Sequence, residues 1–443
     1  MGRVRWLALA LLIALVATAC ADGVDGSQPA ASGSGAPDGS APDERPEAEP
    51  DPTEPDPTDW DAVRETADGA TLSFYLWGGS TEIVDFVEDV YGPELAELGV
   101  ELDLVPIADT ADAVNAVLGE LEAGRDQGGS VDVIWIDGEN TATLRQADAL
   151  LSGWAEQLPN AALVDWDDPS VAYDAGQPVD GDESPWGSAQ FQFVHDTERH
   201  AVEQLPASYA ELADWIEANP GRFTYPAPPA FHGTRLITGW FYELADDPEA
   251  WAAGFDEDAY ERIAEELFAE LERLEPALWR DGGTYPSDIA ELDRLFANGE
   301  VDLTFTQLPA GLDGSIEAGT LPPTARPYVF DTGGIADHHY LAIPVNSSEP
   351  AAAMVLANLV LEPHLQVRKL DPAEGWGDGI AIAPDRIDDQ PARTALEQLT
   401  ASLGDTAVDP AVLDAARLPE ATVELTTRLE DDWNRRIRQG AGG

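Results

Sequence analysis

Short apolar strands alternate with longer helical stretches between residues 71 and 136, and this alternation limits the fold more than any other feature. Strand-like segments at 71–77, 100–106 and 131–136 are separated by helical patterns at 82–91 and 109–123. Such a series predicts a mostly parallel sheet with helices on both faces. Ligands of these sheets bind beyond the carboxyl ends of the strands. Here those ends carry Trp77-Gly78-Gly79-Ser80 and Asp137-Gly138-Glu139-Asn140-Thr141.

A second block of strands and helices begins at Trp186. Its pattern predicts strands at 190–195, 222–225, 301–307, 327–330 and 340–344, and helices at 208–218, 248–279, 287–297 and 350–360. The strand at 222–225 is expected to run into a loop made rigid by prolines. Residues 69–443 are numerous enough for two lobes rather than one core.

The first twenty residues have the pattern of an export signal. Arg3 and Arg5 precede an apolar run from 6 to 16, and Ala17-Thr18-Ala19 lead to Cys20, the sole cysteine. The run is shorter than the about 20 apolar residues that a spanning helix needs. Its ending resembles the lipobox of bacterial lipoproteins, with alanine at 17 where leucine is more common, which implies a lipid on Cys20. A plain signal peptide with an incidental cysteine is the alternative. A single cysteine excludes internal disulfides and thiolate metal clusters.

Residues 21–68 are rich in Pro, Asp, Glu, Gly, Ser and Ala and show no apolar period. We expect them to form a disordered acidic linker that spans roughly 40 Å.

The charge of the chain is strongly negative. Lysine and arginine total 23 against 85 aspartates and glutamates, for a net charge of −62, and Lys369 is the only lysine. Nucleic acid is therefore excluded as a partner, because neutralising phosphates needs clustered cations. Binding of cations is one interpretation of the acidity. The acids are spread along the whole chain, however, which favours a solvated acidic surface suited to high salt.

Four blocks of sequence carry a family resemblance. They are GRDQGGSVDVIWIDGEN at 124–140, PWGSAQF at 185–191, NPGRFTYPAPP at 219–229 and RPYVFD at 326–331. In this order they resemble the YnjB-type solute-binding proteins of ABC transporters, and the similarity extends from about residue 71 to 432–436. The resemblance implies an α/β, two-lobed, class II periplasmic-binding-protein fold, each lobe a mostly parallel sheet flanked by helices. It also implies a chain that closes on a solute and delivers it to a permease and its ATPase.

Relatives of this group are often labelled possible thiamine carriers. This chain departs from the family at three expected site positions, where it has Gln307-Leu308-Pro309 in place of an Asn-Pro pair, Asp337 near a position where an asparagine is common, and Thr141 in place of an aromatic residue. The resemblance therefore leaves the solute open.

The resemblance also divides the chain. After the lipoprotein signal peptide at 1–20 and the linker at 21–68, which their own patterns predict, it implies lobe 1 at 69–187 plus 336–376 and lobe 2 at 188–335 plus 377–440. The chain would cross between lobes near 186–190, 333–340 and 376. We expect an extracytoplasmic monomer, lipid-anchored to the outer face of the cell membrane, or periplasmic in a host with an outer membrane.

Ligand contacts are expected where the strand ends of the two lobes face each other. The aromatic candidates are Trp77, Trp186 and Tyr225, and the polar candidates are Ser80, Asp137, Glu139, Asn140, Gln190, Gln307 and Asp337. For any one aromatic residue, core packing is the alternative. Acidic Asp137, Glu139, Asp331 and Asp337 lie near a single expected cation, Arg235, which favours a neutral or cationic organic solute over an anion.

Catalysis and metal binding have little support in the sequence. The folded region has no Gly-x-Ser-x-Gly elbow, and its histidines have no partner motif. His338 and His339 are adjacent on a predicted strand and so point to opposite faces, which disfavours a shared metal. We therefore expect no catalytic residue, no metal and no cofactor. The remaining alternative to a transport component is a membrane-anchored extracellular enzyme, such as a hydrolase, or a surface adhesion-type protein.

Overall fold

The computed structural model describes residues 55–136 and 138–439. The predicted signal peptide with Cys20, most of the predicted linker, Asp137 and residues 440–443 lie outside the described residues. Among the helices of the described residues, none is both long and apolar enough to cross a membrane.

The strands form two main sheets and one small hairpin. Their bounds are β1 Thr71–Trp77, β2 Glu101–Ile107, β3 Val133–Ile136, β4 Tyr173–Asp174, β5 Gln177–Pro178, β6 Glu183–Gln190, β7 Gln192–Asp196, β8 Leu303–Thr306, β9 Ala325–Tyr328, β10 Gly334–Ala342 and β11 Arg417–Leu418. The six-stranded sheet has the order β11-β10-β3-β1-β2, with β6 paired to β10. The three-stranded sheet has the order β8-β7-β9, and β4 pairs with β5.

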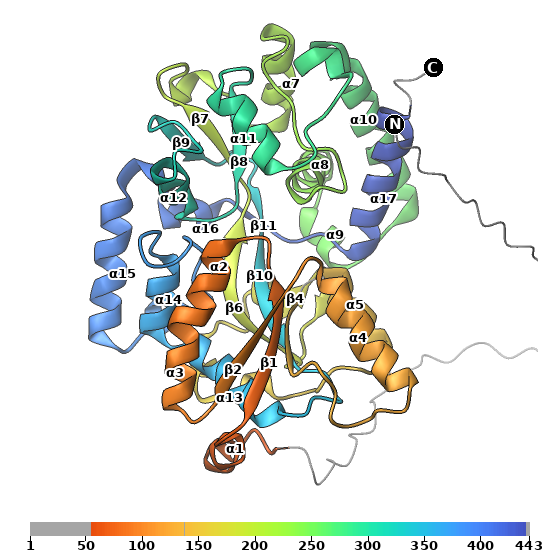
Figure 1. Cartoon of the computed structure of the whole chain (residues 1–443). Coiled ribbons are helices and arrows are strands. Elements are labelled where there is room, and N and C mark those ends of the chain that lie inside the picture. Colours follow the sequence, from red (N-terminus) through yellow and green to blue (C-terminus); the bar gives the residue numbers. More distant parts are fainter. Residues whose placement is uncertain (1–54, 137, 440–443) are drawn as a thin grey trace, which may run out of the picture. The chain divides into compact units, whose positions relative to one another are not determined.

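Helices lie between and around these strands (Figure 1). Their bounds are α1 Trp60–Ala67, α2 Thr81–Phe86, α3 Gly92–Glu97, α4 Thr110–Glu122, α5 Gly138–Gln146, α6 Pro169–Ala172, α7 Tyr209–Ala218, α8 Phe231–Leu244, α9 Pro248–Ala253, α10 Glu257–Leu274, α11 Ile289–Ala297, α12 Gly311–Glu317, α13 Pro350–Val360, α14 Pro363–Leu370, α15 Gln390–Leu403, α16 Pro410–Ala415 and α17 Val423–Trp433. Several begin at the caps that the sequence offers, such as Asp109 before α4 and Ser208 before α7, whose side chains accept backbone N–H groups.

The six-stranded sheet is mixed rather than wholly parallel. Strand β1 pairs in parallel with β2 and β3, as the alternating pattern predicts, and it buries Leu72, Phe74 and Leu76. Strand β10 then pairs antiparallel with both β3 and β6. This sheet and helix α13 share one apolar core, to which Leu341 and Trp186 also belong.

The three-stranded sheet differs from the predicted parallel arrangement, because β7 pairs antiparallel with both β8 and β9. It shares a second core with helices α7, α8, α10, α11 and α17. Strand β7, which follows β6 of the other sheet, lies in the middle of this sheet. Its two neighbours, β8 and β9, both run in the opposite direction to it.

Strands β6 and β10 connect the two sheets. In the antiparallel register, Tyr340 of β10 lies opposite Ile136, the last residue of β3, so the earlier part of β10 extends beyond the end of β3. Strand β6 follows the same part of β10, with Gln190 opposite Ala336, and the chain then enters β7. The carboxyl ends of β1 and β3 therefore face the three-stranded sheet, and Figure 1 shows this for β1.

Three predicted boundaries differ from the structure. Helix α1 lies inside the predicted disordered linker, because its buried Val63 and Ala67 pack against α13. Residues 222–225 form no strand, and the missed helix α8 follows them. The predicted division places residues 377–440 in lobe 2, whereas Ala381 and Ile387 within this segment pack with Val164 and Leu361 of the six-stranded side.

Candidate functional site

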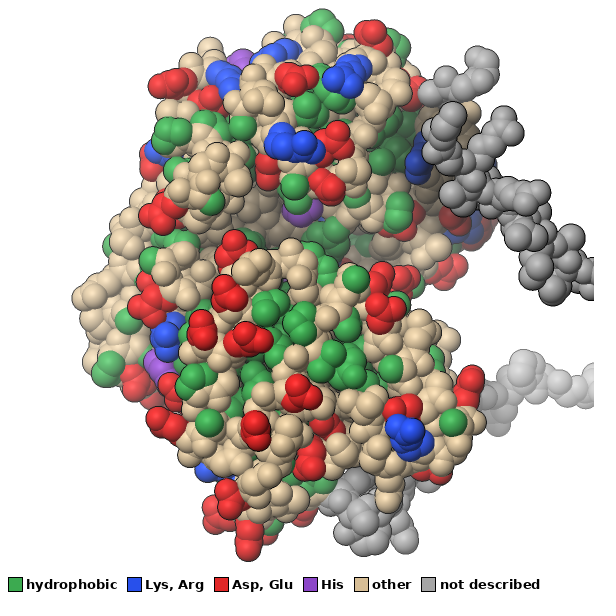
Figure 2. Space-filling view, in the orientation of Figure 1, with side chains coloured by type: hydrophobic (Ala, Val, Ile, Leu, Met, Phe, Trp, Pro, Cys, Tyr) green, Lys and Arg blue, Asp and Glu red, His purple; other side chains and the backbone are tan. Residues whose placement is uncertain are grey.

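The candidate site lies where strand ends of the two sheets face each other. The last residue of β8, Thr306, pairs with the first residue of β7, Gln192, so the carboxyl end of β8 faces the six-stranded sheet. Figure 2 shows this face of the molecule hollowed between its two halves, with acidic side chains along the edges. A separate depression of about 750 Å³ lies along α3 and the edge strand β2 and contains none of the predicted site residues.

The end of β1 presents an open aromatic surface. Trp77 is 42% exposed, and its indole ring lies against Gly79, where a Cβ atom would overlap the ring. Ser80 caps α2, since its hydroxyl accepts the Ile83 N–H at 3.4 Å and donates to Glu82 at 2.7 Å. Trp77 is thus placed to contact a flat or cationic group, while Ser80 already has protein partners.

The start of α5 is fixed by a buried carboxylate from the β4–β5 hairpin. Both oxygens of Asp174 accept the Gly138 N–H, at 2.8 and 2.9 Å. Predicted site residue Glu139 follows at once and is exposed, and Asn140 is half-buried. Asp137, the other residue predicted here, lies outside the described residues.

A buried arginine joins the two sides of the site. The Arg235 guanidinium in α8 contacts the Glu420 carboxylate at 2.6 Å and the Asp337 carboxylate of β10 at 3.3 Å. Glu420 in turn accepts the Ala175 N–H of the β4–β5 hairpin at 3.0 Å. Arg235 also lies over the ring of Phe231, which is 48% exposed. The cation that the sequence places near the site is therefore held by two carboxylates.

The residue next to Phe231 adds no positive charge at neutral pH. Burial lowers the pKa of His232 to about 4, and the charge of Arg235 contributes to the lowering. A histidine with this pKa is neutral over the physiological range.

Two carboxylates from opposite sides of the site interact. Glu430 of α17 accepts the Thr234 hydroxyl at 2.6 Å, and α17 packs into the core of the three-stranded sheet. Burial raises the pKa of Glu430; the Thr234 hydrogen bond lowers it, and the charges of Glu139 and Asp431 raise it further. Glu139 lies on the six-stranded side, so the two sides present like charges to each other.

Two predicted aromatic contacts are core residues in this structure. Trp186 has 0% exposure and packs edge-on against Phe74 and Trp135 and obliquely against Trp376. Tyr225 is buried too, and its hydroxyl accepts the Trp433 indole N–H at 3.1 Å. The alternative of core packing therefore applies to both, because Trp186 lies inside β6 and faces the core of the six-stranded sheet, while Tyr225 belongs to no strand and packs into the other core.

The predicted glutamines lie at the junction of the sheets. The Gln190 amide donates to the carbonyls of Leu413 and Ala416, at 2.9 and 3.1 Å, so it ties β6 to the segment before β11. The backbone N–H of Gln190 donates to the Gln307 carbonyl at 2.9 Å. Gln307 and Asp337 are both buried.

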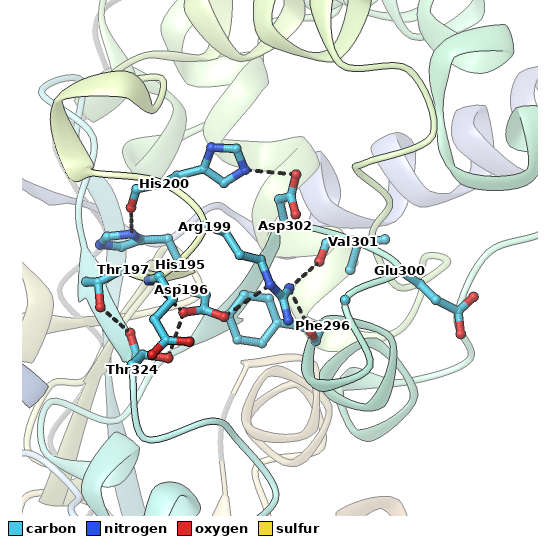
Figure 3. A network of polar contacts seen from close by, with 12 residues as sticks. His195, Asp196, Thr197, Arg199, His200, Phe296, Glu300, Val301, Asp302 and Thr324 are labelled. Atoms are coloured by element: carbon cyan, nitrogen blue, oxygen red, sulfur yellow. Dashed lines mark hydrogen bonds and ion pairs between the residues drawn. The ribbon is translucent and has the colours of Figure 1, made fainter.

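Four of the six histidines have polar partners within the fold. His338 bonds the Ser170 carbonyl at 2.8 Å, and His339 on the opposite face of β10 bonds Asp378 at 2.9 Å. His195 and His200 belong to a polar network at the far end of β7 (Figure 3), where His200 meets Asp302 at 3.0 Å. In the same network Arg199 donates to the carbonyls of Phe296 and Val301. Within 55–136 and 138–439 no group of three or more His, Cys, Asp or Glu side chains has the arrangement of a metal site.

Sequence reasoning missed part of this arrangement. The missed residues are Phe231, His232, Thr234, Glu420 and Glu430. Phe231, His232 and Thr234 belong to a helix that was not predicted, although the PAPP segment that precedes it marked a break. Glu420 and Glu430 stand among so many acids that the sequence gives no signal for either.

Comparisons with known proteins agree with this geometry. Residues 94–380 match the family described as bacterial extracellular solute-binding protein. Protein YnjB of Escherichia coli (strain K12) is 39% identical over 330 residues, which cover 74% of this chain and 84% of that protein.

Solved structures extend the likeness to the fold. An ABC transporter structure from Clostridium perfringens ATCC 13124 has a TM-score of 0.58 at 16% identity, covering 83% of this chain and 99% of that one. A periplasmic thiamin binding protein has a TM-score of 0.51 at 16% identity, covering 83% and 96%. The predicted resemblance is confirmed: the chain belongs to the bacterial extracellular solute-binding proteins, and it is a YnjB-type component of an ABC importer that acts outside the cytoplasm by binding rather than by catalysis.

Proposed function

We propose that the chain captures a neutral or cationic small organic solute between its two sheets and delivers it to the permease and ATPase of the importer. In this proposal a lipid on Cys20 tethers the protein to the outer face of the membrane, and the acidic linker lets the folded part search the space above it. Trp77 supplies an aromatic contact, and Glu139 and Glu430 supply negative charge from opposite sides.

The main support for the proposal is the pairing of Arg235 with two carboxylates. Recognition of a carboxylate or phosphate needs paired cationic donors, and Arg235 already contacts the carboxylates of Asp337 and Glu420. Its single positive charge meets two negative ones before any solute arrives. Glu139 and Glu430 add like charges across the groove, which a bound cation would relieve.

The name of one similar structure agrees with this class of solute. One of the similar structures is a thiamin binding protein, and thiamine combines a positive charge with aromatic rings. Such a molecule suits an exposed indole flanked by carboxylates, because cations are attracted to the face of an aromatic ring. We therefore use thiamine as the first probe.

A titration at high salt tests the charge of the solute. At 1 M salt the screening length falls to about 3 Å, so only contacts in the site survive, and general attraction to the acidic surface is removed. We expect thiamine to bind the parent protein under these conditions, and Glu430→Gln to weaken it about tenfold, as expected for loss of a charged partner. Glu424→Gln, an exposed change on the same helix, is the matched control and should have no effect.

Binding of an anion would contradict the proposal. Saturable binding of a phosphate ester or a dicarboxylate at 1 M salt, abolished by Arg235→Ala, would overturn the proposal. It would mean that Arg235 leaves its carboxylates to hold an anion.

The anchor has a separate test. Cys20→Ser should release an exported protein that no longer partitions into detergent, whereas the parent should partition into it. Equal partitioning of the two proteins would rule out the lipid anchor without affecting the proposed solute.

A further inference from the structure

Gln307 lies at the junction of the two sheets with its backbone held on both sides. It directly follows β8, at the end of that strand that faces the six-stranded sheet. Its carbonyl accepts the Gln190 N–H at 2.9 Å, and three residues later the Ala310 N–H donates to the Gly377 carbonyl at 3.0 Å. The backbone position of Gln307 is therefore set by the fold.

The side chain of Gln307 is buried without being satisfied. Only 6% of the residue is exposed, and neither the amide nitrogen nor the amide oxygen has a hydrogen-bond partner among the described residues. Buried amides nearly always have partners, because an unpaired donor or acceptor keeps the full cost of leaving water. An amide that the fold does not use needs another reason to be there.

The other buried glutamines show how the fold normally treats this side chain. Gln366 donates to the carbonyls of Trp186 and Val360, at 3.0 and 2.6 Å, and accepts the Ala381 N–H at 2.8 Å. Gln190 and Gln192 both donate to backbone carbonyls. Within the described part of the chain, Gln307 is the buried glutamine for which both amide atoms lack a partner.

We propose that the side-chain amide of Gln307 selects the solute by forming two hydrogen bonds with it, to a donor and an acceptor that are neighbours on the solute. A primary amide offers one N–H donor and one C=O acceptor on the same edge, so it pairs with groups such as a carboxamide, a lactam or an aminopyrimidine. This deepens the proposed function and rests on it: the solute class becomes a neutral or cationic organic molecule that carries such an edge. A site of this kind rejects analogues that lack the edge, because binding them leaves buried polar atoms unpaired.

The variant Gln307→Met separates a role in binding from a role in folding. Methionine has a similar length and no hydrogen-bonding amide, so it removes the polar atoms and keeps the volume. If no protein group needs the amide, chemical denaturation should show an unfolding midpoint equal to or above that of the parent. Gln366→Met is the matched control and should lower the midpoint, because three backbone groups would lose their partner.

Two probes test the selection itself at 1 M salt. Thiamine carries an amino donor beside a ring-nitrogen acceptor, whereas putrescine has amine donors and no acceptor. We expect Gln307→Met to weaken thiamine binding by about tenfold or more and to leave any putrescine binding unchanged, as measured by calorimetry.

Several outcomes would overturn the inference. A lower midpoint for Gln307→Met would show that the protein or a structural water uses the amide, and unchanged thiamine affinity would remove its role in selection while the proposed function stands. Tight binding of a phosphate ester would instead overturn the proposed function. If neither probe binds the parent protein, the solute should be identified from protein purified from its own host. A solute without a neighbouring hydrogen-bond donor and acceptor would overturn the inference.

Discussion

Two groups of buried charges lie near the junction of the sheets, and they are built in opposite ways. Around Lys369, the ammonium contacts the Asp378 carboxylate at 2.6 Å and the Gly379 carbonyl at 2.5 Å, and His339 meets the other oxygen of Asp378. Lys369 and the Asp378 side chain are both 0% exposed. Around Arg235, two carboxylates share one cation, and the ring beneath it is half exposed.

The difference separates a charge used for stability from charges available for binding. The Lys369 group is enclosed by the aromatic rings of Trp135 and Trp376, and Gly187 beside it has no room for a Cβ atom. The charges of Lys369 and Asp378 are matched, and both side chains are fully buried. The Arg235 group has an excess of negative charge and an open edge, so a solute can change its energy.

The largest expected effect comes from breaking the closed group. Lys369→Met leaves Asp378 buried without its lysine partner and should cost about 3 to 5 kcal/mol of unfolding free energy. The neighbouring Arg368→Met removes an exposed pair with Glu374 and should cost at most about 1 kcal/mol. Denaturant unfolding of both variants measures the contrast, and similar losses would contradict it.

A second prediction compares two tryptophans. Trp186→Ala opens a cavity among packed rings and should cost about 3 kcal/mol, near the low end for this substitution because neighbouring rings can partly close the space. Trp77→Ala, at a 42% exposed position, should leave the midpoint almost unchanged and weaken thiamine binding. If Trp186→Ala folded normally and lost only thiamine binding, Trp186 would be a ligand contact rather than a core residue.

A third prediction concerns pH and two neighbouring histidines. Burial, and after it the charge of Arg417, lowers the pKa of His338 to about 4. The folded state therefore resists its protonation, and this stability is lost as pH falls from about 6.5 towards 4. For His339, burial opposes protonation but the Asp378 carboxylate raises the pKa above its ordinary value. Its contribution is complete below about 6.5 and is lost as pH rises through the folded pKa.

The measurement is the unfolding free energy of His338→Asn and His339→Asn between pH 4 and pH 8. Between pH 6.5 and pH 4, the loss of unfolding free energy should be about 2 kcal/mol smaller for His338→Asn than for the parent protein. For His339→Asn, the loss of unfolding free energy on the alkaline side should also be smaller than in the parent, by a lesser amount. Curves that keep the parental shape in both variants would show that neither histidine is coupled to folding.

The smallest expected effect lies in the open site. Gly79→Ala places a Cβ in the space of the Trp77 ring, which is free to move outwards, so stability should change by no more than about 0.5 kcal/mol. The emission of Trp77 and the affinity for thiamine should both change. Gly119→Ala, in α4 with open space around it, is the control and should stabilise the protein by about 0.5 to 1 kcal/mol. A large loss of stability for Gly79→Ala would mean that the ring is fixed.

The regular part of the fold could be predicted from the sequence. The predicted segments 71–77 and 350–360 coincide with β1 and α13, because both have clear apolar patterns with marked ends. Helix α8 could not be predicted in the same way. Residues 233–242 are buried throughout, including Thr234, Arg235 and Thr238, so the polar residues of this segment do not mark an exposed face.

The candidate site could be predicted only in part. The chain positions of the strand ends locate Trp77, Glu139 and Gln307, but not the face to which each side chain turns. Trp186, inside β6, belongs to the core, and Arg235 pairs with Asp337 and with Glu420, a residue 185 positions away in the sequence. Contacts over such distances depend on packing that no local pattern records.

Lys369 also gives the chain an unusual chemical property. It is the only lysine among 443 residues, and it is fully buried. An amine-directed acylating reagent therefore finds no lysine amine on the folded surface, and it gains one only when the region between the sheets opens. The mass increase at Lys369 would report the fraction of molecules in which this region has opened, in the natural sequence and without an introduced label.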